Sequence, residues 1–140
     1  MSTAGYSGTP LPRKLGIHDG SRLLLVEAPD GFATTLGELP PGVELVAARA
    51  TGVDVAVLFA LEAAAVRARF GGLAAALQPA GGLWIAWPKR SSGVATDLDE
   101  NVVREIGLAA GLVDNKVCAI DSTWSGLRFV WRLCDRPSHI

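Results

Sequence analysis

An unbroken apolar run over residues 83–87 ends at Pro88 and gives way to a basic, hydroxyl-rich loop over residues 89–93. A short apolar run of this kind is typical of a strand that is covered on both faces, as in the parallel sheets of α/β proteins. Open α/β sheets bind their ligands where the carboxyl ends of the strands meet. The run therefore predicts a buried strand, and the loop after it is a candidate ligand-binding segment.

Similar apolar runs recur along the chain, separated by turn residues or by segments with helical spacing. The expected strands are residues 22–28, 43–47, 54–59, 83–87, 115–121 and 127–133, and the expected helices are residues 32–36, 61–77 and 97–110. Strands that alternate with helices and end in a hairpin predict a mostly parallel sheet with one antiparallel strand. The expected fold class is therefore α/β, a single Rossmann-like three-layer domain over residues 1–140 with an antiparallel C-terminal hairpin strand.

The order of the strands is predicted from their apolar continuity. Residues 23–26, 55–59, 83–87 and 117–120 are expected to be parallel neighbours, with residues 129–133 antiparallel at or near an edge. One connection is strained, because residues 48–53 reach only about 20 Å when fully extended. The strand over residues 43–47 is therefore expected to be either very short or antiparallel.

The ends of the helices and of the chain carry local signals. Thr96 stands three residues before Asp99, which resembles a capping box and predicts that Thr96 caps a helix beginning at Asp97. Glycines and prolines recur over residues 1–14, so this segment is expected to be an extended arm instead of a helix. Residues 135–140 are expected to form a short tail.

Charge and composition exclude several classes of protein. The chain has 13 basic and 14 acidic residues and a net charge of -1, so no long-range field favours nucleic acid. No run approaches the roughly 20 apolar residues of a bilayer-spanning helix, so no membrane association is expected. The first residues lack the pattern of a secretory signal, which predicts a cytoplasmic location. Cys118 and Cys134 are expected to be free thiols, and no histidine has a metal-ligand partner at a recognisable spacing.

Polar residues cluster at the predicted carboxyl ends of the strands, which a parallel sheet brings to one edge. The candidate ligand-binding residues are Glu27, Asp30, Lys89, Arg90, Ser91, Ser92, Asp121, Thr123 and Trp124. We expect Lys89, Ser92, Asp121 and Trp124 to lie in one surface depression. This inference locates a site without naming a substrate, because it holds for any protein of this fold.

Each motif at this edge has a second interpretation. Lys89 and Arg90 could bind an anion before a helix amino terminus, but the acids between residues 97 and 100 favour a solvated loop in which these charges pair. Trp124, in the predicted hairpin loop, covers either the core edge, a ligand or a partner. No acid, base and nucleophile stand in a catalytic pattern, so no catalytic residue is assigned.

The order of the elements resembles the later half of a class I methyltransferase-like Rossmann fold. Such an enzyme would show a glycine-rich turn after the first strand and an acidic residue at the end of the second. Here the turn is residues 28–31, in which Pro29 removes a backbone donor, and the second strand runs into Arg49. A standard methyltransferase cofactor site is therefore not expected, and no cofactor is assigned.

Four motifs together are distinctive, namely residues 4–11, residues 14–17, residues 87–93 and residues 121–127. Over nearly the whole chain they resemble a bacterial family that is catalogued only as a domain of unknown function. The resemblance implies a small intracellular Rossmann-like protein and carries no established activity. No functional residue is transferred from it.

Two functions from different classes fit these observations. The first is a small-molecule or nucleotide-binding module, as in a methyltransferase relative that has lost its cofactor site. The second is a protein-protein interaction or oligomerisation protein, in which Trp124 and the arm contact a partner or a second copy of the chain. An enclosed depression beside Lys89 and Asp121 would favour the first, and a flat apolar patch around Trp124 the second.

Overall fold

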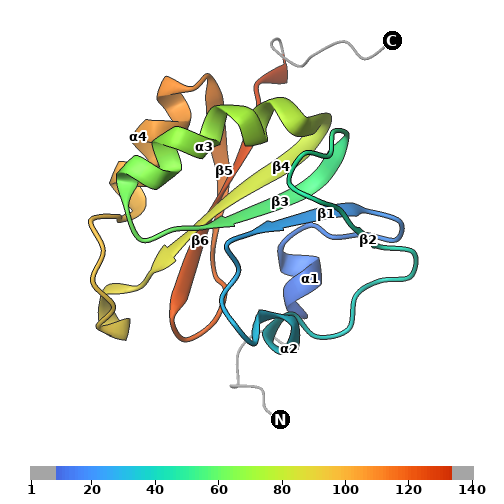
Figure 1. The fold of residues 1–140 in the computed structure, drawn as a ribbon, viewed down its shortest axis with the longest axis horizontal. Coiled ribbons are helices and arrows are strands. Elements are labelled where there is room, and N and C mark those ends of the chain that lie inside the picture. The colour runs from blue at the N-terminus through green and yellow to red at the C-terminus, as the bar shows by residue number, and fades with distance from the viewer. Residues whose placement is uncertain (1–8, 134–140) are drawn as a thin grey trace.

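The computed structural model describes residues 9–133, which form one sheet with helices on both faces (Figure 1). The strands are β1 (Arg22–Val26), β2 (Glu44–Leu45), β3 (Val53–Phe59), β4 (Leu77–Pro88), β5 (Leu112–Ala119) and β6 (Trp124–Trp131). The helices are α1 (Leu11–Lys14), α2 (Phe32–Leu36), α3 (Ala63–Ala76) and α4 (Glu100–Ala109), and η1 (Arg90–Ser92) is a 3-10 turn. The sheet order is β2-β1-β3-β4-β6-β5, parallel from β2 to β4, with β6 antiparallel to both of its neighbours. The expected fold class is confirmed.

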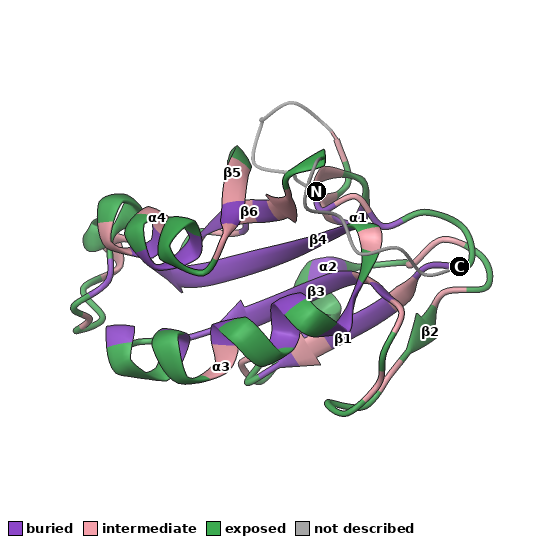
Figure 2. Ribbon diagram, turned by 90° about the horizontal axis from the view of Figure 1, so that it is seen from above, coloured by how far each residue is buried: buried purple, intermediate pink, exposed green. Residues whose placement is uncertain are grey.

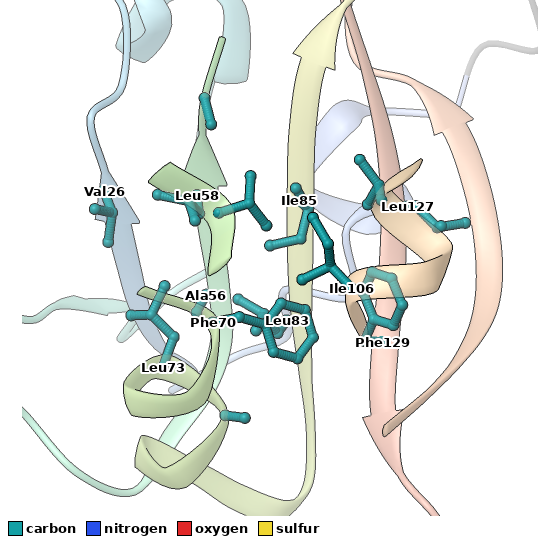
Figure 3. Packing of buried hydrophobic residues seen from close by; sticks show 14 of the residues in the cluster. Val26, Ala56, Leu58, Phe70, Leu73, Leu83, Ile85, Ile106, Leu127 and Phe129 are labelled. Atoms are coloured by element: carbon teal, nitrogen blue, oxygen red, sulfur yellow. The ribbon is translucent and has the colours of Figure 1, made fainter. Parts of the chain in front are cut away.

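Alternation of side chains along the strands divides the apolar core into two layers, because successive residues of a strand point to opposite faces. Leu24 of β1 packs in the layer beneath α3 and α4, whereas Leu23 packs in the layer with α1 and α2. In the first layer the rings of Phe70 in α3 and Phe129 in β6 meet edge to face, with centroids 5.2 Å apart (Figure 3). Helices therefore cover both faces, as a three-layer fold requires.

Residues 83–87 of the central strand β4 are deeply buried and at most 6% exposed (Figure 2). This agrees with the unbroken apolar run in the sequence. The indole Nε1 of Trp84 donates a hydrogen bond of 2.9 Å to the carbonyl oxygen of Leu15, which supplies the partner that a buried indole N–H needs. That bond also holds the segment after α1 against the sheet.

The predicted neighbours of β4 are partly wrong. Residues 117–120 are not adjacent to β4, because β6 lies between β4 and β5. β6 buries Leu127 and Phe129, which are 1% and 0% exposed, whereas Val117 of β5 is 52% exposed. The more apolar strand of the hairpin takes the interior position, since only there are both of its faces covered. The antiparallel strand is thus next to the edge, and β5 forms the edge.

The predicted start of the second long helix is also wrong. α4 begins at Glu100, and its N-cap is Asp99, whose side chain accepts a hydrogen bond of 2.8 Å from the backbone N–H of Val102. Thr96 instead donates to the carbonyl oxygen of Leu61 and accepts from the N–H of Leu98. Residues 96–98 therefore form a connection to the start of α3, and a capping pattern alone could not reveal that tertiary contact.

The amino-terminal arm was expected to be extended, but its last residues, Leu11–Lys14, form α1. Prolines are compatible with this helix because they occupy its N-cap and first turn, where no intrahelical N–H bond is lost. Residues 1–8 and the expected tail lie outside the described residues. The strand expected over residues 43–47 is very short and parallel, since β2 contains only Glu44–Leu45 and pairs with β1.

Candidate functional site

The carboxyl ends of β1, β3, β4 and β5 lie at one edge of the sheet, together with the amino end of β6. The loops after β4 and before β6 touch there, because the backbone N–H of Lys89 donates a hydrogen bond of 2.7 Å to the carbonyl oxygen of Thr123. The loop after β4 and the hairpin are therefore on the same side of the molecule, as the sequence predicted.

A hollow of about 470 Å³ opens at this edge, on the face covered by α1 and α2. We call it the carboxyl-edge hollow. Its lining includes Leu11, Lys14, Thr35, Lys89, Ile120 and Asp121. Lys89 and Asp121 thus share a depression, as expected, whereas Ser92 and Trp124 are not part of its lining.

The charges that line the carboxyl-edge hollow favour an anion. Two half-buried lysines, Lys14 and Lys89, line it together with one carboxylate, Asp121. Asp121 is engaged in its own turn, because its Oδ1 accepts hydrogen bonds of 2.8 Å from the backbone N–H groups of Thr123 and Trp124. Those two donors stabilise the carboxylate within the hairpin, and the apolar side chains of the lining lower the local dielectric around both ammonium groups.

The thiol of Cys118 lies near the same lysines. Burial raises the pKa of Cys118 above its ordinary value, and the ammonium groups of Lys14, Lys116 and Lys89 act in the opposite direction. Desolvation is the larger effect, so this free thiol is protonated at neutral pH. All three lysines lie close enough to the sulfur to act on it, which places a cluster of positive charge at this end of β5.

The basic loop itself closes on its own backbone. The hydroxyl of Ser92 donates a hydrogen bond of 2.7 Å to the carbonyl oxygen of Lys89 and accepts one of 3.1 Å from the N–H of Val94. Arg90 and Ser91 are exposed. Within residues 9–133, neither Lys89 nor Arg90 forms an ion pair, so the expected pairing with the acids after the loop is wrong. One of those acids, Asp97, is instead bonded to α3.

Glu27 and Asp30 lie at the carboxyl end of β1 but do not line the carboxyl-edge hollow. Glu27 is exposed, adopts a left-handed backbone with φ of 59°, and its carboxylate lies 3.9 Å from the guanidinium of Arg69. Asp30 is exposed in the turn that leads into α2. The structure therefore does not bring these two carboxylates together with Lys89 and Asp121.

Trp124 is the first residue of β6 and not the tip of a loop. Its ring is half-buried and meets Phe59 edge to face, with centroids 5.1 Å apart. The ring of Phe59 in turn contacts that of Phe32, with centroids 4.8 Å apart. Trp124 therefore closes the edge of the apolar layer beneath α1 and α2, which is the first of the three roles considered for it.

Sequence reasoning missed the part of the hollow that α1 and α2 contribute. Leu11, Lys14 and Thr35 are distant in sequence from the hairpin that they face. Leu11 and Lys14 were expected in an extended arm and Thr35 in a short helix, so nothing indicated that these residues would lie beside the hairpin. The hydrogen bond of 3.2 Å from Lys116 Nζ to the carbonyl oxygen of Lys14 shows how closely the two segments approach.

Comparisons with known proteins identify the fold. No protein-family model matches the chain, and no curated protein matches its sequence. Among solved structures, a SAM-dependent methyltransferase from Aquifex aeolicus superposes with a TM-score of 0.61 and 16% identity, covering 84% of this chain and 85% of that one. The fold is that of the SAM-dependent methyltransferases.

Two further methyltransferase structures agree. A TehB-like SAM-dependent methyltransferase from Corynebacterium glutamicum gives a TM-score of 0.54 at 11% identity, covering 92% of this chain and 91% of that one. The mitomycin 7-O-methyltransferase MmcR gives a TM-score of 0.57 at 9% identity, and the match covers 88% of this chain but only 53% of the MmcR chain. The resemblance to an uncharacterised bacterial family stays a prediction, since no family model supports it.

The residues that would hold the cofactor of this fold do not fit it. The turn after β1 contains Pro29, which has no N–H to donate. Glu27, directly after β1, has a positive φ, so a charged side chain stands where a glycine would leave the backbone open to a ligand. The chain after β2 runs through residues 46–49, which include no carboxylate that could hold a ribose. We therefore derive no chemical step through S-adenosylmethionine.

No group of three potential metal ligands occurs among residues 9–133. Over the same residues, no helix combines the length and the apolar character needed to cross a bilayer.

Proposed function

We propose that this protein is a small-molecule-binding module that holds an anionic ligand in the carboxyl-edge hollow. The observation that carries the proposal is the placement of Lys14 and Lys89 in one hollow. Among residues 9–133, its single lining carboxylate is Asp121, which is already bonded within its own turn. A phosphate or a carboxylate would accept charge-assisted hydrogen bonds from these ammonium groups. Thr35 and Ser122 add hydroxyl groups to the same lining.

The ligand should carry an apolar part beside its anionic group. Leu11 and Ile120 line the hollow together with the two lysines. Sites for small molecules commonly combine an apolar lining with a few polar groups that fix the orientation of the ligand. Nucleotides and aromatic or aliphatic carboxylates belong to this class, whereas a bare inorganic ion would leave the apolar lining unused.

The structure favours this proposal over an interaction or oligomerisation protein. The feature expected of a ligand-binding module was an enclosed depression beside Lys89 and Asp121, and a hollow lined by both residues supports the module. A flat apolar patch around Trp124 was the feature expected of an interaction protein, yet the ring of Trp124 packs on Phe59. The cytoplasmic location and the possible homo-oligomer stay predictions.

A thermal-shift screen of nucleotides, S-adenosylmethionine and sugar phosphates tests the proposal. A ligand at 100 times its dissociation constant should stabilise the folded state by about 2.7 kcal/mol. Lys89→Gln should reduce that shift, because it removes one charge from the hollow and keeps a polar side chain. Arg67→Gln is the matched control, since Arg67 is exposed on α3, over the opposite face of the sheet.

Equal loss of the thermal shift in both variants would indicate a general effect of net charge and would contradict a site at the hollow. Stabilisation by S-adenosylmethionine that is insensitive to Lys89→Gln would point to the turn after β1 instead. Absence of any shift, combined with concentration-dependent association of the protein, would favour the interaction function.

A further inference from the structure

A second hollow, of about 330 Å³, lies at the opposite, amino edge of the sheet. We call it the amino-edge hollow. Ser21, Asp54, Gly81 and Arg128 are among the residues that line it. It shares no lining residue with the carboxyl-edge hollow, so it is a separate feature of the fold.

An irregularity in the sheet forms part of this hollow. Val53 pairs with Leu77 and Val55 pairs with Gly82, so β4 places residues 78–81 opposite the single residue Asp54 of β3. Bulges of this kind redirect side chains and are common beside functional sites. Gly81 is required there, because a Cβ atom at that position would lie 2.7 Å from the carbonyl oxygen of Val53.

The guanidinium of Arg128 lies against the backbone of Gly82. A Cβ atom at Gly82 would lie 2.4 Å from Arg128 Nε and 2.6 Å from Nη2, so any larger residue there would displace the guanidinium from β4. Arg128 also approaches Asn115, with 3.4 Å between Nη1 and Oδ1. The chain thus places a positive charge in the lining of the hollow.

Ser21 supplies an independent indication that the hollow could bind a ligand. It is 6% exposed, and its Oγ accepts a hydrogen bond of 2.9 Å from the backbone N–H of His18. Within residues 9–133 no group accepts the proton of its hydroxyl. A buried donor without an acceptor is costly, so an acceptor atom in the hollow would stabilise it.

Asp54 provides the opposite charge. Its Oδ2 accepts a hydrogen bond of 2.8 Å from the backbone N–H of Arg22, which fixes the carboxylate at the start of β3. Its Oδ1 has no hydrogen bond to another described residue. The hollow therefore offers donors from Ser21 and Arg128 and an acceptor from Asp54, and Asp19 adds a second carboxylate to the lining.

We propose that the amino-edge hollow binds a small zwitterion of the type of a free α-amino acid. The carboxylate of the ligand is held by Arg128 and the hydroxyl of Ser21, and its ammonium group by Asp54. A simple anion would meet two carboxylates in the lining, and a simple cation would leave the Ser21 proton without an acceptor. The site is independent of the anion site proposed at the carboxyl edge.

Amide chemical-shift titrations with three probes of nearly equal size test this proposal. L-Alanine is the zwitterion, L-lactate lacks the ammonium group, and L-alaninamide lacks the carboxylate. We expect saturable shifts at Ser21, Asp54 and Gly81 with L-alanine, and at least roughly tenfold weaker binding of the other two probes, because each loses a charge-assisted contact. The proposal would be overturned if L-lactate or L-alaninamide bound as tightly as L-alanine, or if no probe caused a saturable shift.

Variants separate the roles of the lining residues. Ser21→Ala and Arg128→Gln should each weaken L-alanine binding, the second by at least roughly tenfold. Arg49→Gln, which changes an exposed arginine away from this lining, is the matched control and should bind normally. The amide spectrum of each variant reports whether it is folded. Normal binding of L-alanine by folded Arg128→Gln protein would contradict the proposed orientation of the ligand.

Discussion

The carboxylate of Asp97 accepts a hydrogen bond of 2.7 Å from the backbone N–H of Ala63, although the two residues are 34 positions apart. Ala63 is the first residue of α3, so Asp97 supplies one of the acceptors that the free N–H groups of a helix start require. Glu62, the N-cap residue, makes no capping hydrogen bond with its own side chain. α3 is therefore capped by the segment that leads into α4.

Asp97→Ala should destabilise the fold by about 1 kcal/mol, the usual cost of losing a capping side chain. The measurement is the midpoint of urea denaturation at constant slope. Asp99→Ala is the comparison, because Asp99 caps its own helix and should cost a similar amount. An unchanged midpoint for Asp97→Ala beside a lowered one for Asp99→Ala would contradict the long-range cap.

Gly107→Ala should destabilise the fold by roughly 1–3 kcal/mol or more, because the added methyl group would overpack the core. A Cβ atom at Gly107 in α4 would lie 2.0 Å from the ring of Phe129, inside the contact distance of any two carbon atoms. Gly72→Ala in α3 is the matched control, since nothing lies within 4 Å of its Cβ position. That control should be neutral or stabilising by up to about 1 kcal/mol, as helix propensity predicts. Equal thermal stability of the two variants would contradict the prediction, because it would mean that α4 or the Phe129 ring shifts at no cost to accommodate the methyl group.

Trp124→Ala should lower stability by about 2 kcal/mol, because the half-buried ring packs on Phe59 at the edge of the core. The affinity for a ligand of the carboxyl-edge hollow should change less, since Trp124 does not line that hollow. Denaturation and a binding titration on the same variant separate the two effects. Stability equal to that of the parent protein with lost binding would restore Trp124 as a ligand contact.

Alkylation of Cys118 by iodoacetamide should be slow at neutral pH and should accelerate with an apparent pKa above that of an ordinary thiol. Burial of the thiol raises its pKa, and only the thiolate reacts. Measurement in a Cys134→Ser background isolates the signal. Lys116→Gln should slow the reaction further, because the Lys116 ammonium group lowers this pKa. Unchanged kinetics in that variant would mean that Lys116 does not act on the thiol.

The same shift has a consequence for stability. The folded state holds the Cys118 proton to a higher pH than the unfolded chain does, so above the unfolded thiol pKa the unfolded state binds fewer protons. Stability should therefore fall as the pH rises through the alkaline range, and Cys118→Ala should remove that part of the decline. A pH series of denaturation midpoints for the two proteins provides the measurement.

The candidate site could be predicted only in part. The sequence placed Lys89 and Asp121 at one edge because both follow strands that run in the same direction, and this geometry depends little on detail. It could not place Glu27 and Asp30, which share the edge but not the hollow, or Lys14, which lines the hollow from α1. Those positions depend on how the connections pack across the sheet, and local periodicity carries no information about that packing.

The sequence was sufficient to predict that residues 83–87 form a buried strand, since an unbroken apolar run of strand length needs cover on both faces. It also determined the α/β class, because the alternation of such runs with helical spacing is local information. Three features became evident only in the folded molecule: β6 lies between β4 and β5, Asp97 caps α3, and Ser21 and Arg128 share a hollow. Each of these features depends on contacts between segments that are distant in sequence, and such contacts form only when the whole chain is packed.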